Sequence, residues 1–204
     1  VVDGEVNGEV SRKMLKDDFL FSEHTNNDFS WNYDFKGQDF TIEYIDFIEN
    51  AKKELIENEN GEKYLKIVEA SKGNRHEHFL KFGEVTSVHN ILFALNKPTE
   101  GAINISDSGN ELIINSPFSG DYMRMADQMQ GNLKQNTDQV LLLRSLYNVA
   151  GLQFVFPNPV INGRFEIIKS DEETQQDGLF LKVSSNGDHK EIGLLGAKGI
   201  VNDP

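Results

Sequence analysis

Apolar and polar residues alternate over much of this chain, which is the period-2 pattern of β-strands with one buried face. The clearest case spans residues 31–44, where Gly37 and Gln38 can form a two-residue type II′ turn because glycine readily takes the positive φ of the first turn position. This register predicts three cross-strand pairs of large apolar residues on one face: Phe35 with Phe40, Tyr33 with Ile42, and Trp31 with Tyr44. We therefore predict a β-hairpin here.

The alternation changes phase after Tyr44, because Ile45 and Phe47 fall where the preceding residues of the same phase are polar. A β-bulge shifts the phase in this way, so we predict a bulge at this point. Residues 51–70 begin with good helix formers, but Asn60-Gly61 followed by YLKIV favours a second hairpin.

Residues 75–105, RHEHFLKFGEVTSVHNILFALNKPTEGAINI, form the stretch around which the chain is organised. His76 and His78 alternate in phase with Leu80 and Phe82, so one strand face carries both imidazoles and continues into apolar residues. Turns are predicted at Gly83-Glu84 and from Pro98 to Gly101, with strands at 85–88, 91–95, 102–105 and 112–114.

The remaining part of the chain, from residue 115 to residue 204, contains both weakly patterned segments and clear strands. Residues 117–131 are predicted as a short helix, residues 138–150 are ambiguous between helix and strand, and strands are expected at 152–156 and 164–168. Asn186-Gly187 is a strong type I′ turn signal. It predicts a last hairpin that pairs Leu181 with Ile192, Leu179 with Leu194 and Val183 with Lys190.

These patterns predict an all-β fold of antiparallel hairpins, arranged as a β-sandwich or as two packed β lobes with one or two short helices. Residues 1–30 are weakly patterned and precede a β-rich domain at 31–204. The segment PNPVING at 157–163 is the candidate boundary between two lobes.

Composition narrows the possible partners. Twenty Lys and Arg against 33 Asp and Glu give a formal net charge of −13, which disfavours binding to nucleic acids and polybasic attachment to anionic lipids. The chain has no cysteine, so disulfides, thiolate nucleophiles and cysteine-ligated metals are absent. It starts at Val1 and contains no apolar run of transmembrane length, so we interpret it as a piece of a longer protein that carries any membrane span or targeting signal elsewhere.

Three histidines are the sharpest chemical feature of the chain. His76 and His78 lie two residues apart on a predicted strand, which places their Cα atoms about 6.5–7 Å apart and their side chains on one face. They could share a metal or haem iron, with His89 as a third ligand if its strand lies alongside. The simpler interpretation is a pair of polar residues at the exposed end of a strand that becomes buried at Leu80.

Methionines form the second candidate cluster, because Met123, Met125 and Met129 fall within seven residues. Thioethers can bind Cu(I), contact haem or form an adaptable apolar surface, although such residues more often belong to the core. No nucleophile elbow, phosphate-binding loop or other catalytic motif is found in the sequence. We therefore name no catalytic residue, and the identity of any metal stays open.

Several segments, read in order, resemble the extracytoplasmic domain of ResB-like (CcsB-type) cytochrome c biogenesis proteins of Bacteroidetes. They lie at 46–70, 75–105, 116–131, 143–157 and 194–204, and the segment at 75–105 is the most specific. In that family this domain is often fused to a CcsA-type haem-handling half.

The resemblance implies an accessory domain on the periplasmic face of the cytoplasmic membrane, within a membrane-anchored parent protein. Its partners would be the CcsA-type protein or half and apocytochrome c, and haem would be the cofactor of the complete assembly. That assembly would export haem and attach it to the CXXCH site as a holocytochrome c synthase, whereas this domain alone is not expected to be an enzyme. The alternative from a different class is a stand-alone secreted β-sandwich that serves as a binding module of a surface protein.

Overall fold

The computed structural model describes residues 2–6, 9–13, 20–22, 24–25, 27–35, 37–71 and 74–197. Within these residues the chain is all-β, as the alternation predicts, and every regular element is a strand. The described part of the chain therefore contains no helix long and apolar enough to span a membrane. The chain divides into two compact units, which we call unit 1 (Val1–Leu55 and Phe165–Pro204) and unit 2 (Ile56–Arg164).

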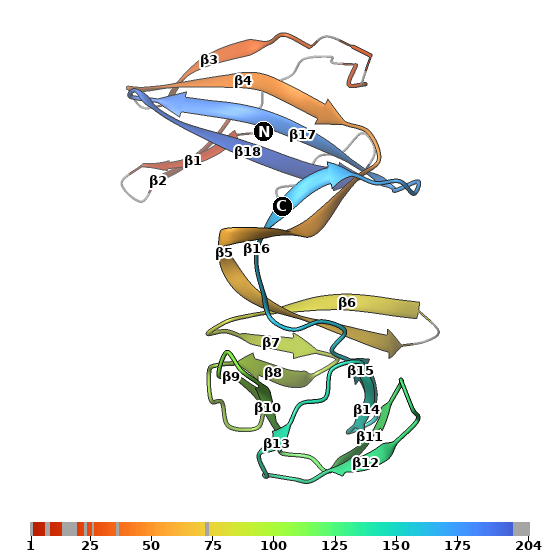
Figure 1. Cartoon of the computed structure of the whole chain (residues 1–204). Coiled ribbons are helices and arrows are strands. Elements are labelled where there is room, and N and C mark those ends of the chain that lie inside the picture. Colours follow the sequence, from red (N-terminus) through yellow and green to blue (C-terminus); the bar gives the residue numbers. More distant parts are fainter. Residues whose placement is uncertain are drawn as a thin grey trace. The chain divides into compact units, whose positions relative to one another are not determined.

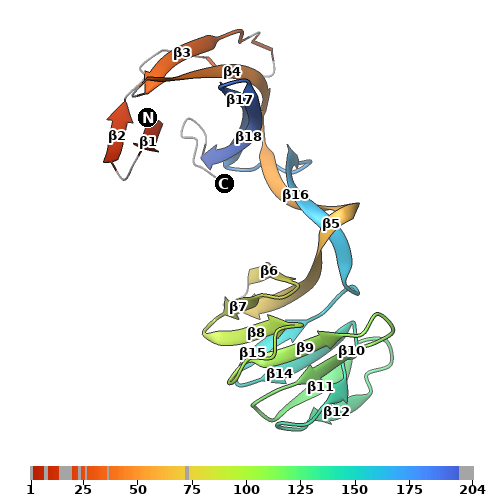
Figure 2. The same ribbon diagram turned by 90° about the vertical axis from the view of Figure 1, so that its left-hand side faces the viewer.

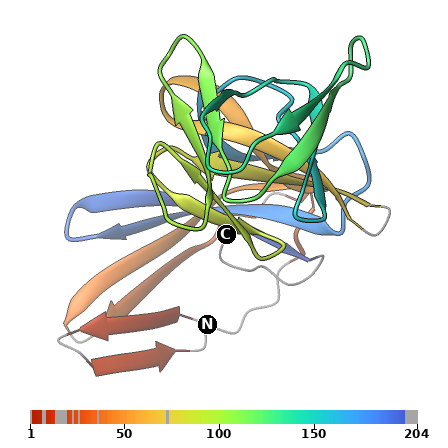
Figure 3. The ribbon, with the colours of Figure 1, turned by 90° about the horizontal axis from the view of Figure 1, so that it is seen from below.

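Unit 1 is built on an antiparallel sheet with the strand order β18-β17-β4-β3 (Figure 1). Its strands are β3 (Ser30–Phe35), β4 (Gln38–Ile48), β17 (Gln176–Ser185) and β18 (Asp188–Ala197). A separate two-stranded sheet is formed by β1 (Val2–Val6) and β2 (Glu9–Lys13), shown in red in Figure 3. The buried core of the larger sheet consists of Ile42, Phe47, Leu179 and Leu181. Phe29 and Trp31 pack against this core, and their two rings stack on each other with centroids 4.3 Å apart.

Unit 2 contains a five-stranded sheet of order β13-β10-β9-β8-β7. Strands β7, β8, β9 and β10 are labelled in Figure 2, and β13 is labelled in Figure 1. The strands are β7 (Val85–Val88), β8 (Ile91–Leu95), β9 (Ile103–Asp107), β10 (Leu112–Asn115) and β13 (Gln139–Val140). The pair β8–β9 is parallel and the other pairs are antiparallel.

The second sheet of unit 2 has the order β12-β11-β14-β15-β5-β16, and β6 also pairs with β5. Its strands are β5 (Ala51–Ser71), β6 (Asn74–Lys81), β11 (Gly120–Arg124), β12 (Gln130–Leu133), β14 (Ser145–Val149), β15 (Leu152–Val155) and β16 (Ile161–Lys169). The chain crosses between the two units along β5 and again along β16.

The two sheets of unit 2 enclose one hydrophobic core. Phe93 of the five-stranded sheet meets Phe154 of the second sheet edge to face, with ring centroids 5.2 Å apart, and both side chains are fully buried. Leu65 and Ile67 of β5 and Leu80 of β6 join the same cluster. Unit 2 is therefore a sandwich whose inner faces carry alternate residues of each strand.

Several sequence predictions are confirmed. β6, β7, β8, β9 and β10 follow one another where the pattern of residues 75–114 places them. The last hairpin has the expected register at all three predicted pairs, and Asn186 and Gly187 have φ values of 53° and 88°. The bulge is also present: Phe180 pairs with Asp46 and Leu181 with Tyr44, so Ile45 is the extra residue and is 42% exposed.

The hairpin at residues 31–44 is present, but its predicted register is wrong by two residues. Tyr33 pairs with Phe40 and Trp31 with Ile42. A shift of two residues keeps every side chain on its face, so the core-facing pattern cannot distinguish the two registers.

Two further predictions are wrong. Asn60-Gly61 does not form a turn, because β5 continues as one strand from Ala51 to Ser71. The helix expected at residues 117–131 is instead the β11–β12 hairpin, whose turn includes Met125, Ala126 and Asp127. The ambiguous residues 138–150 contain β13 and β14.

The boundaries between the units lie at Leu55/Ile56 and Arg164/Phe165. The candidate boundary at 157–163 ends just before the second of these points. The first lies inside the continuous strand β5, where no loop-forming residue marks it in the sequence.

Candidate functional site

The three histidines of the organising stretch surround one buried acid, Glu69. On β5, Leu65, Ile67 and Glu69 alternate toward the core of unit 2, and Glu69 is only 1% exposed. A carboxylate at a position of this kind requires hydrogen-bonding partners, because burying a charge without them costs several kcal/mol.

β6 brings the first two histidines beside Glu69. In the antiparallel register His76 pairs directly with Glu69, His78 with Ile67 and Leu80 with Leu65. This confirms that one face of β6 carries both imidazoles and then the buried Leu80. His78 Nε2 lies 3.7 Å from Glu69 Oε1, and the His78 side chain is 30% exposed.

His89 reaches the same carboxylate from the opposite sheet. It occupies the tight turn between β7 and β8 with a left-handed φ of 47°, and its Nε2 lies 2.8 Å from Glu69 Oε1. The contact therefore joins the five-stranded sheet to β5 at the end of the core.

Only some of the polar atoms in this cluster have hydrogen-bond partners. Glu69 Oε2 and His78 Nε2 are both buried and have no hydrogen-bond partner among the described residues. Burial raises the pKa of the Glu69 carboxyl, but the hydrogen bond from His89 and the charges of His89 and His76 outweigh it, so the pKa is lowered from its ordinary 4.5. The carboxylate is the favoured form.

The geometry of the cluster is that of an inter-sheet hydrogen-bonded contact. Within the part of the chain that the structure describes, no group of three or more His, Asp or Glu is arranged to hold a metal ion. Sequence reasoning found His76, His78 and His89 but missed Glu69. Continuing the alternation of Leu65 and Ile67 by one step would have placed this acid on the core face.

The methionines lie elsewhere on unit 2. Met123 is on β11 and pairs with Leu146 of β14. Met125 and Met129 lie in the connection between β11 and β12 and are 54% and 45% exposed. Arg124 and Asp127 close this turn with an ion pair, which holds the pKa of Asp127 at about 2.

The structure places Met125 and the three histidines in different surroundings. Met125 lines a hollow to which none of the three histidines contributes, and His89 Nε2 is already bonded to Glu69.

The hollow that includes Met125 has a volume of about 680 Å³. It lies over β5, β14 and β15, and its mostly apolar lining includes Val68, Leu146 and Val155. Arg75 and Arg144 supply its positive charges.

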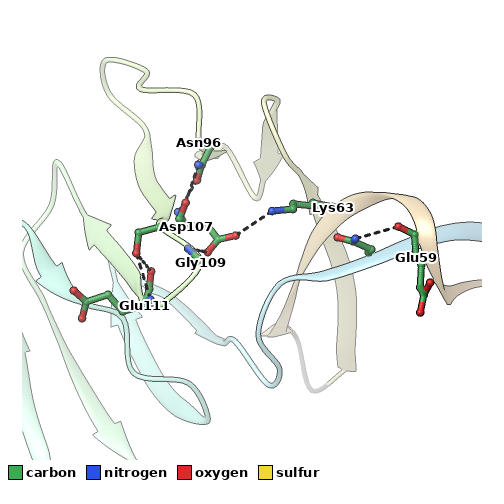
Figure 4. A network of polar contacts seen from close by, with 8 residues as sticks. Glu59, Lys63, Asn96, Asp107, Gly109 and Glu111 are labelled. Carbon is green, nitrogen blue, oxygen red and sulfur yellow. Dashed lines mark hydrogen bonds and ion pairs between the residues drawn. The ribbon is translucent and has the colours of Figure 1, made fainter.

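A second hollow of about 400 Å³ lies beside the β9–β10 turn. Figure 4 shows that its polar groups bind one another: Lys63 Nζ lies 4.0 Å from Asp107 Oδ2, and the Gly109 amide donates to Asp107 Oδ1 at 2.8 Å. The Asn96 side chain holds both the amide and the carbonyl of Asp107, at 2.6 and 3.1 Å. This network fixes the β9–β10 hairpin.

Comparisons with known proteins add no relative. No family model matches the chain, and no curated protein or solved structure matches it significantly.

Proposed function

We propose that this chain is the accessory extracytoplasmic domain of a membrane machine that exports haem and assembles cytochrome c. In that assembly it would act beside a CcsA-type haem-handling partner, and the complete complex would attach haem to the CXXCH site of apocytochrome c. The role of the domain itself would be docking and positioning, and the covalent chemistry would belong to the complex.

The observation that supports this proposal is the position in unit 2 of residues 75–105, the segment with the most specific family resemblance. Residues 75–105 form β6, β7, β8 and most of β9, and so contribute to both sheets of the sandwich. His89 and His78 of this segment turn toward Glu69. These contacts support a framework that presents a surface to a partner.

Two large apolar side chains of this segment remain exposed and are candidate partner contacts. Phe82, at the end of β6, is 39% exposed, and Leu92 on β8 is 38% exposed although its neighbours Ile91 and Phe93 are buried. Exposed aromatic side chains are frequent anchors of protein interfaces, so Phe82 is the better candidate.

Association with the membrane partner is the direct test. The chain is produced with an affinity tag together with a CcsA-type protein, and the two are purified in mild detergent. We expect co-purification, and we expect Phe82→Ser to reduce it about tenfold, as for an interface anchor worth more than 1 kcal/mol. An unrelated all-β domain with the same tag controls for non-specific capture.

Phe118→Ser is the matched control variant. Phe118 is 38% exposed, almost the same as Phe82, but lies outside residues 75–105, so we expect it to leave co-purification unchanged. The isolated chain, given haem and a CXXCH peptide under reducing conditions, is expected to form no covalent haem–peptide. Covalent product from the chain alone, or no co-purification of the unsubstituted chain, would contradict the proposal.

A further inference from the structure

The outer face of the second sheet of unit 2 carries an apolar row across three strands. Val68 of β5 pairs with Val155 of β15, and Val155 pairs with Leu146 of β14. These three side chains are only partly buried, whereas their neighbours Glu69, Phe154 and Tyr147 face the core and are buried. The row forms the floor of the 680 Å³ hollow.

The walls of the hollow are fixed by well-defined contacts. Met125 and Ala126, in the β11–β12 turn, line one side, and Pro157 lines another. The Arg124–Asp127 ion pair braces the turn, and the Met125 amide donates to the carbonyl of Arg144 at 3.2 Å. A volume of this size lies within the range of roughly 300–1,000 Å³ that is usual for small-molecule sites.

Arg144 brings a positive charge to the rim of the hollow. Its φ of 54° is in the left-handed region, which is costly for a residue with a Cβ, and its amide donates to the Phe156 carbonyl at 2.8 Å. Its Nε donates to the Pro157 carbonyl at 3.3 Å. Within the described residues its two Nη groups make no hydrogen bond, so they remain able to form a fork around an anion.

A second positive charge comes from β6. Arg75 lines the hollow, and its Nη2 lies 3.2 Å from Glu77 Oε1, while Lys66 Nζ lies 2.6 Å from Glu77 Oε2. Together Arg75, Lys66 and the Glu77 carboxylate carry a net charge of +1. The one acid of the lining, Glu69, has a fully buried side chain that is bonded to His89.

The hollow is therefore an apolar, locally positive site on a chain whose net charge is −13. We propose that it binds a small apolar molecule that ends in a carboxylate. The apolar part would lie along Val68, Val155 and Leu146 between the walls at Met125 and Pro157. The carboxylate would accept hydrogen bonds from the Nη groups of Arg144, with Arg75 adding attraction at longer range.

The test compares dodecanoate with dodecanol, each below its micelle concentration, by titration calorimetry on the complete chain. We expect saturable binding of dodecanoate and at least tenfold weaker binding of dodecanol, because a charge-assisted hydrogen bond contributes more than 1.4 kcal/mol. Acetate, which has the charge but no chain, is expected not to bind measurably. In NMR spectra, dodecanoate is expected to shift the methyl signals of Val68, Leu146 and Val155.

Substitutions of Arg144 test the contribution of its charge to binding. Arg144→Gln is expected to weaken dodecanoate about tenfold and to leave dodecanol unchanged, whereas Arg144→Glu is expected to reverse the preference in favour of dodecylammonium. Lys97→Gln, an exposed cation in the β8–β9 loop, is the control and should change nothing. Should Arg144→Gln fail to fold, Val155→Asp blocks the floor of the same hollow and is expected to abolish binding.

Equal binding of dodecanoate and dodecanol would overturn the proposal. Unchanged binding in the Arg144 variants, or dimerisation through this face in sedimentation experiments, would overturn it as well. None of these outcomes bears on association with a CcsA-type partner, which is tested separately.

Discussion

At the scale of single residues, Glu69 is the most informative position in unit 2. Its carboxylate is completely buried, yet it receives a hydrogen bond from His89 at 2.8 Å and has His78 at 3.7 Å. An acid at a core position is retained in a stable fold only when its partners offset the desolvation. His89 of the 75–105 segment provides part of that compensation through its hydrogen bond to Glu69 Oε1.

This arrangement predicts a pH dependence of stability with a definite sign. A carboxyl whose pKa is lower in the folded than in the unfolded chain stabilises the fold at high pH and loses that contribution as pH falls through the folded pKa. The pKa of Glu69 is lowered from 4.5, so its contribution should be complete at pH 7 and decline below about pH 4.5. We expect Glu69→Gln to lower the free energy of unfolding at pH 7 by about 1 kcal/mol. The difference in free energy of unfolding between this variant and the unsubstituted chain, measured by urea titration, should become smaller at lower pH.

Glu77→Gln is the matched control for this measurement. Glu77 is also an acid beside basic side chains, but it is 42% exposed, so its ion pairs with Lys66 and Arg75 are screened by solvent. We expect little change in the free energy of unfolding at any pH. Equal pH profiles for the Glu69 and Glu77 variants would show that Glu69 does not stabilise the fold as a carboxylate.

At the scale of elements, the long strand β5 depends on a close approach between two glycines. A Cβ added to Gly61 would clash with the Gly163 carbonyl oxygen on β16, and the next nearest atoms are also backbone. Backbone cannot yield as a flexible side chain does. Glycine at position 61 thus marks a place where another strand comes unusually near.

We expect Gly61→Ala to force β5 and β16 apart and to destabilise unit 2 by about 1–3 kcal/mol, the usual cost of overpacking. Hydrogen exchange should accelerate at the amides of both strands around residues 61 and 163. Asn60→Ala, at an exposed neighbouring position, is the control and should change stability by less than about 0.5 kcal/mol. Equal stability of the two variants would refute the steric argument.

The contact between Gly61 and Gly163 also explains why one hairpin prediction failed while a similar one succeeded. Asn186-Gly187 and Asn60-Gly61 are both hairpin signals, and the first forms the predicted turn because the strands around it pair locally. At Asn60-Gly61 the partner is Gly163, about a hundred residues away in sequence, and no local pattern reports it.

Two other features of the structure could not be predicted from local sequence patterns, for related reasons. Residues 117–131 have no strong alternation, and β11 pairs with β14 as well as with its hairpin partner β12. At the candidate site, the strand spacing of His76 and His78 was predictable. Their convergence with His89 on Glu69 required the packing of two sheets.

At the scale of the whole molecule, the buried residues that the structure describes form two separate hydrophobic cores. The core of unit 2 centres on Phe93, Phe154 and their neighbours, and that of unit 1 on Ile42, Phe47, Leu179 and Leu181. A unit with its own core can unfold on its own, so a single free energy of unfolding need not describe the chain.

We predict that damage to one core leaves the other unit folded. Trp31 is the only tryptophan and packs against the unit 1 core, so its fluorescence reports unfolding of unit 1. Phe154→Ala should destabilise unit 2 by about 3–5 kcal/mol, seen as early loss of unit 2 methyl signals in NMR spectra during urea titration. The Trp31 transition should not move.

Leu181→Ala provides the reciprocal experiment. It removes a buried leucine from the unit 1 core, which should lower the free energy of unfolding of unit 1 by about 2–5 kcal/mol. The urea midpoint of the Trp31 transition should fall accordingly, while unit 2 methyl signals persist. Since β5 and β16 run through both units, the two variants together test whether these strands couple the two transitions. Coincident shifts of both transitions in both variants would show one cooperative molecule, and independent shifts would show that each core stabilises its own unit.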